Sequence, residues 1–102
     1  MTITGNQNRL TRDMALVLCG MFARSNMGLG LPTREEISWA KQAELKTPRT
    51  SAEFLCLAFG ESDAVAAMVA AVAEAWLKRL SGLTLGEVRK GWPDVVDVYE
   101  GG

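Results

Sequence analysis

The chain has 102 residues, of which 48% are hydrophobic and 23% are charged, and its formal net charge at pH 7 is −1. This length and composition predict a single globular domain, 1–102, and exclude a disordered chain. The small net charge provides no general attraction to nucleic acid or to an acidic membrane surface.

The first fifty residues begin with a polar stretch, 1–8, which we expect to be a flexible arm. Apolar residues then recur at three- and four-residue spacing and predict a helix from Leu10 or Thr11 to Arg24. Two arginines before an apolar run also resemble the order of charges in a signal peptide. No small-residue cleavage pattern follows, however, so we expect a cytoplasmic protein.

The segment 25–32 is predicted to be a loop because two glycines interrupt the helical pattern. Its apolar side chains are unusual for a connecting loop, and they either fold back over the core or form an exposed contact surface. The same choice applies to a tryptophan between Gly91 and Pro93. We name these side chains as candidate partner-binding residues: Met27, Leu29, Leu31 and Trp92.

Two helices are predicted on either side of a turn at 46–49. Thr33 and Glu36 have the spacing of a capping box and begin a helix over about 33–45, whose thin apolar face places it on the outside of the domain. Thr50 or Ser51 is expected to cap the second helix, over about 51–59, which is apolar around nearly its whole circumference.

The stretch from Ser62 to Leu80 has the strongest helical signals in the chain. Its larger apolar side chains form one helix face and alanines form a second, so we expect it to be buried on all sides or against a partner chain. The uninterrupted apolar run is too short to cross a bilayer. The predicted fold class is therefore all-α: a small single-domain helical bundle of four to six helices around this central Ala-rich helix, about 62–81.

The C-terminal part contains a second capping box, Thr84 with Glu87, which predicts a short helix that ends near Gly91. Pro93 followed by Asp94 favours another helical turn. The valines that follow favour an extended segment equally well, so residues 93–99 are either helical or extended.

The residue types exclude most catalytic chemistry. The chain has no histidine, the commonest general base and metal ligand. Cys19 and Cys56 both lie within apolar runs, so we expect them to be buried free thiols in a protein of a reducing compartment. Two separated cysteines cannot form a structural zinc site by themselves. We therefore predict no enzyme activity, no catalytic residue, no cofactor and no metal.

The excess of apolar residues instead favours a non-catalytic protein–protein interaction module. Such a protein would act as an adaptor, accessory factor or inhibitor that docks on a larger protein. Residues 1–50 contain seven basic and four acidic side chains, a balance of +3, and residues 51–102 contain four and eight, a balance of −4. With the alanine face of the 62–81 helix, this asymmetry predicts a homodimer through Ala66, Ala67, Ala70 and Ala71.

The alternative function is a small DNA-binding regulator with a helix-turn-helix formed by residues 33–45 and 51–59. Its candidate DNA-binding residues are Lys41, Lys46 and Arg49. The second helix would read the bases, but its side chains are apolar rather than polar. We therefore expect weak or undetectable binding to nucleic acid.

Overall fold

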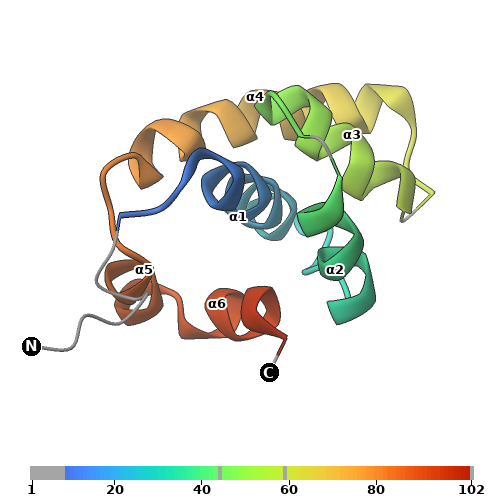
Figure 1. The fold of residues 1–102 in the computed structure, drawn as a ribbon. Helices are drawn as coiled ribbons and strands as arrows, with labels where there is room; N and C mark the ends of the chain where they lie inside the picture. The colour runs from blue at the N-terminus through green and yellow to red at the C-terminus, as the bar shows by residue number, and fades with distance from the viewer. Residues whose placement is uncertain (1–8, 44, 59, 102) are drawn as a thin grey trace, which may run out of the picture.

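The computed structural model describes residues 9–43, 45–58 and 60–101, and the arm predicted over 1–8 lies outside them. The described residues form six helices and no strand, so the all-α prediction is confirmed (Figure 1). An isolated β-bridge joins Arg9 to Thr84. The helices are α1 (Arg12–Asn26), α2 (Arg34–Gln42), α3 (Pro48–Ala58), α4 (Asp63–Leu80), α5 (Leu85–Gly91) and α6 (Pro93–Glu100).

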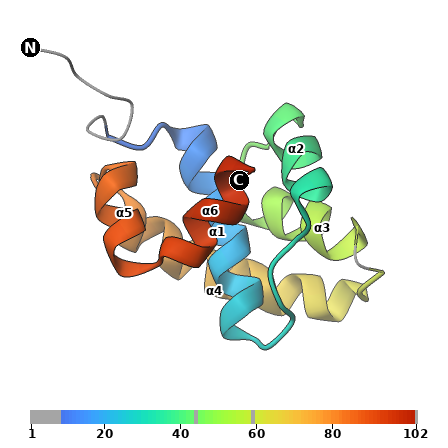
Figure 2. The ribbon, with the colours of Figure 1, turned by 90° about the horizontal axis from the view of Figure 1, so that it is seen from below.

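Helix α1 passes through the middle of the bundle. Helices α3 and α4 pack side by side on one side of α1, and α6 lies on the opposite side (Figure 1). Seen from below, α6 lies over α1, α4 lies behind it, and α2 flanks them (Figure 2). Every residue of α1 from Ala15 to Arg24 is buried, so α1 is the helix that the others enclose.

Helix α4 confirms the helix predicted over 62–81 but not its burial on all sides. The face that packs on α1 and α3 is buried, whereas Met68 on the opposite side of the helix is 60% exposed. The physical reason is position: α4 lies at the edge of the bundle and has neighbours on one side only. The buried residues are Ala66, Val69, Ala70, Ala73, Trp76 and Leu80.

Short-range capping sets the helix starts. The Thr33–Glu36 and Thr84–Glu87 capping boxes are both present, and the Ser62 hydroxyl accepts a hydrogen bond from the Val65 amide at 3.3 Å. These three predicted starts are confirmed.

The start of α3 was predicted wrongly. The helix begins at Pro48, not after a cap at Thr50 or Ser51, because proline at the first helical position loses no hydrogen bond and has a suitable φ. The Thr47 hydroxyl accepts from the Thr50 amide at 3.1 Å, so Thr47 provides the cap. Ser51 is buried instead, and its hydroxyl donates to the Leu16 carbonyl at 2.8 Å.

The C-terminal segment is helical rather than extended. Pro93 is the first residue of α6, as its missing amide hydrogen allows. Val95, Val96 and Tyr99 are all buried, and this spacing gives one face of a helix. The contact of this face with the core outweighs the preference of valine for extended backbone.

Candidate functional site

A cluster of three aromatic rings contains the predicted partner-binding residue Trp92. The rings of Phe22 and Trp76 are stacked, with centroids 4.4 Å apart, and Trp92 meets them edge-on at 5.1 Å and 5.4 Å. The Arg79 guanidinium lies 4.2 Å from the centre of the Trp76 ring. Trp92 is half-buried and attaches the α5–α6 junction to the core. These contacts are the ones expected of a side chain that folds back over the core.

The apolar loop between α1 and α2 also folds back. Met27, Leu29 and Leu31 are half-buried and pack against the core, so they do not form an exposed loop surface. The side chain of Arg24, which is fully buried, donates to the Leu29 carbonyl at 3.1 Å and holds the loop against α1.

One groove brings two of the four predicted partner-binding residues together. Leu31 and Trp92 both line it, and Asp94 provides the charged side chain of its lining. The groove has a volume of about 320 Å³ and lies where the 27–33 loop meets the α5–α6 junction. Met27 and Leu29 do not line it.

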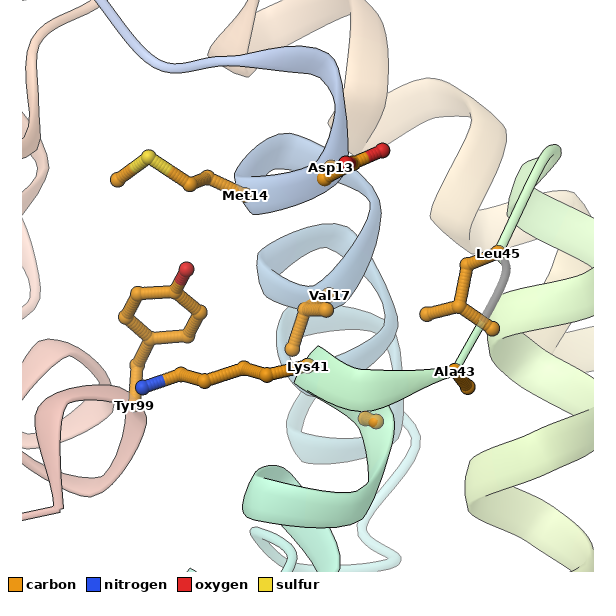
Figure 3. Close-up of a pocket in the computed structure, with 8 residues that line it drawn as sticks. Asp13, Met14, Val17, Lys41, Ala43, Leu45 and Tyr99 are labelled. Carbon is orange, nitrogen blue, oxygen red and sulfur yellow. The ribbon is translucent and has the colours of Figure 1, made fainter.

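A second hollow lies between α1, α2 and α6 (Figure 3). It has a volume of about 260 Å³ and an apolar lining with Asp13, Lys41 and Tyr99 among the residues around it. The Lys41 ammonium lies 4.2 Å from the centre of the Tyr99 ring. Burial raises the pKa of the Tyr99 hydroxyl, the Asp13 carboxylate raises it further, and burial lowers the pKa of Lys41.

Two of the three candidate DNA-binding side chains, those of Lys41 and Arg49, make contacts within the fold. Lys41 lies over the Tyr99 ring, and the Arg49 side chain forms an ion pair with Glu53 at 2.7 Å. The Lys46 carbonyl accepts a hydrogen bond from Arg12 at 2.7 Å, and the Lys46 side chain is exposed. Among the described side chains of α3, Pro48, Ser51, Ala52, Leu55 and Cys56 are buried, so these five cannot contact base edges.

The two cysteines are confirmed as buried free thiols. Burial raises the pKa of Cys19 from 9.0 to about 12. Burial also raises the pKa of Cys56, although the Arg24 guanidinium, 3.8 Å from its sulfur, acts in the opposite direction. A nucleophilic cysteine needs its thiolate form, and this environment disfavours it.

The four alanines predicted to mediate self-association do not form one surface. Ala66 and Ala70 are 5% and 7% exposed and belong to the core of the chain itself. Ala67 and Ala71 are exposed. Neighbouring positions on a helix differ by about 100°, so the pairs 66/70 and 67/71 face different directions.

The exposed pair belongs to a longer apolar stripe, which we call the α4 outer face: Ala64, Ala67, Met68, Ala71 and Ala75. By size, Met68 belongs with the larger apolar side chains that were expected to form the buried face of this helix, but it lies on the exposed side. The positions 64, 68, 71 and 75 have the spacing of one helix face, and that spacing is the signal that identifies it.

Comparison with protein-family models, with curated proteins and with solved structures finds no match to this chain. Within residues 9–43, 45–58 and 60–101, no helix has the length and hydrophobicity that a membrane span requires. The same residues contain no group of three or more side chains suited to hold a metal ion.

Proposed function

We propose that this protein is a non-catalytic protein–protein interaction module, an adaptor, accessory factor or inhibitor, that binds another protein chain through the α4 outer face. The observation that carries the proposal is the exposure of Met68, 60%, in the middle of a stripe of exposed alanines. Contiguous exposed apolar surface is characteristic of interaction sites, and methionine is enriched at interface cores.

The surroundings of the stripe support the same function. Val65 and Val72 are half-buried and widen the apolar surface on one side. Glu74 and Lys78 are exposed and add charge at its edge. An apolar centre with a polar rim is the usual arrangement of a protein–protein interface.

The spacing of the stripe also specifies a mode of recognition. Apolar positions that repeat at three- and four-residue spacing allow a helix to lie in an apolar groove or along a second helix. Alanine side chains let the partner backbone approach closely, and Met68 provides the single long side chain that fills a pocket. The partner therefore presents an apolar helix or groove, in another protein or in a second copy of this chain.

The two free thiols support a location for this activity. Cys19 and Cys56 are both buried and reduced in the fold, as is usual for proteins of a reducing compartment. The proposal therefore includes a cytoplasmic location.

A photo-crosslinking experiment tests the proposed surface. A benzophenone amino acid at position 71, in the middle of the α4 outer face, is expected to give one discrete covalent adduct in cells that express the protein. The same probe at the exposed Glu35 position on α2 is the matched control and is expected to give none.

A second substitution makes this test specific. Met68→Glu places a charge in the stripe and is expected to abolish the adduct, while the melting temperature stays unchanged because the side chain is already mostly exposed. The proposal is wrong if no probe position along the stripe forms an adduct, or if Met68→Glu leaves the adduct in place.

A further inference from the structure

We infer that the partner of the α4 outer face is a second copy of this chain, packed so that the two α4 helices run antiparallel. This inference rests on the proposed function and specifies its partner. Three properties of α4 carry it: the charges at its ends, the position of its large exposed hydrophobic side chain, Met68, and the area of the stripe.

The charges at the ends of α4 determine the direction of pairing. The acidic residues Glu61 and Asp63 lie at its beginning, and Lys78 and Arg79 lie in its last turn. An antiparallel pair brings the acidic beginning of each helix to the basic end of the other. A parallel pair would bring like charges together, and the two helix dipoles would also oppose each other.

Lys78 is well placed for this role. It continues the spacing 64, 68, 71 and 75 by three residues, so it lies on the same side of α4 as the outer face, and it is exposed. The Arg79 guanidinium lies over the Trp76 ring. Lys78 is therefore the cation that an antiparallel partner meets at the end of the stripe.

The stripe is also complementary in shape to a second copy of itself that runs antiparallel. Its middle lies between residues 69 and 70, so a two-fold axis at that point places Met68 opposite the partner's Ala71, and Ala71 opposite the partner's Met68. A two-fold interface requires this reciprocity. Each methionine then packs beside a small side chain, an arrangement that lets two helices interdigitate.

The area of the stripe predicts a weak dimer. Stable protein–protein interfaces bury at least about 1,200 Å² in total, and one helix face of 18 residues is at or below this limit. Each chain already has its own buried core, so it does not need the partner to fold. The expected dissociation constant is in the micromolar range, on the order of 10 to 100 μM.

Sedimentation equilibrium tests the dimer. As the concentration rises from about 10 μM to about 1 mM, the average mass is expected to rise above the 11.0 kDa of the monomer. Met68→Glu and Ala71→Glu should each hold the mass at the monomer value. Trp39→Glu, at an exposed position on α2, is the matched control and should dimerise like the unmodified chain.

Disulfide trapping tests the direction of pairing. Both native cysteines are buried, so they do not compete with introduced thiols. A mixture of Ala64→Cys and Ala75→Cys should form a mixed disulfide dimer, because antiparallel packing brings these positions together. Ala64→Cys alone should form little, because its two copies would lie about 16 Å apart along the helix axis. Efficient dimerisation of Ala64→Cys alone would overturn the antiparallel arrangement.

Charge reversal gives an independent check. Lys78→Glu should weaken the dimer several-fold, and adding Asp63→Lys to the same chain should restore much of the affinity, because each introduced glutamate then lies near an introduced lysine of the partner. Failure of the second substitution to restore any affinity would contradict the charge argument.

The results separate this inference from the proposed function. If the chain stays at 11.0 kDa at every concentration while the probe at position 71 still forms an adduct with a different protein, the dimer is wrong and the interaction module stands. If no self-association and no adduct occur, both proposals are wrong.

Discussion

Gly20 in α1 and Ser51 in α3 approach each other so closely that only a hydrogen atom fits between them. A Cβ atom at position 20 would lie 2.7 Å from the Ser51 hydroxyl oxygen and 2.8 Å from a methyl carbon of Leu55. The same hydroxyl donates to the Leu16 carbonyl at 2.8 Å. This contact fixes where α3 crosses the buried middle of α1.

The first prediction concerns this crossing. Gly20→Ala is expected to destabilise the protein by about 1–3 kcal/mol, because the added methyl group forces apart two well-packed helices. Urea denaturation measures the change. Gly91→Ala is the control: it lies in α5 with nothing within 4 Å of the added carbon, and it should be neutral or stabilising by up to about 1 kcal/mol. Equal stability of Gly20→Ala and the unmodified chain would contradict the close approach.

The second prediction compares Trp92, in the aromatic cluster, with the exposed Trp39. Trp92→Ala removes one ring from the Phe22–Trp76–Trp92 cluster and is expected to cost about 3–5 kcal/mol of folding free energy. Trp39→Ala, at a position 51% exposed, should change the stability by less than about 1 kcal/mol. Thermal unfolding of both variants gives the comparison, and a Trp92 variant that melts with the unmodified chain would return Trp92 to the list of contact residues.

The third prediction is a loss of stability at alkaline pH. Because burial raises the pKa of Cys19 from 9.0 to about 12, the folded state keeps a proton that the unfolded chain loses above pH 9. The unfolded state then binds fewer protons, so the free energy of unfolding falls as pH rises from 9 toward 12. The contribution of this thiol is up to about 1.4 kcal/mol per pH unit.

The measurement compares the unmodified chain with Cys19→Ala. The stability difference between them is expected to be constant below pH 8 and to shift in favour of Cys19→Ala above pH 9. The pKa of Tyr99 is also raised, and its titration acts in the same direction, but this group is present in both chains and cancels. A difference that does not change between pH 8 and pH 10.5 would show that the Cys19 thiol ionises normally in the folded state.

The fourth prediction concerns duplex DNA. Binding at physiological salt is expected to be undetectable or weak, because the net charge is −1 and two of the candidate cations are engaged, Lys41 with Tyr99 and Arg49 with Glu53. Gel-shift titration at about 150 mM salt checks this. A tight, sequence-selective shift that Arg49→Ala abolishes would favour the helix-turn-helix alternative instead.

Much of the secondary structure could be read from neighbouring residues alone. The starts at Thr33, Ser62 and Thr84 depend on a hydroxyl and an amide three residues away, so the physics that sets them is contained in four consecutive residues. The start of α3 at Pro48 also depends on residues close together in the sequence, although it was predicted wrongly. Proline is compatible with both a turn and the first position of a helix, and the hydrogen bond from the Thr50 amide to the Thr47 hydroxyl decides between them.

Other features depend on contacts between distant parts of the chain. Helix α6 is helical because Val95, Val96 and Tyr99 form an apolar face that meets the core, whereas the valines by themselves suit either conformation. Likewise, Trp92 is half-buried because Phe22 and Trp76, which lie in other helices, provide the rings that it contacts.

The sequence by itself determined the all-α class, most helix starts and the burial of Cys19 and Cys56, because local hydrogen bonds and apolar periodicity act over a few residues. Only the tertiary structure decided which apolar helix is enclosed. Both α1 and α4 are rich in apolar residues, but α1 has neighbours on opposite sides and α4 has them on one side. The free energy of burial depends on how much apolar surface other helices cover. Because no described helix covers the Met68 side of α4, that side stays exposed.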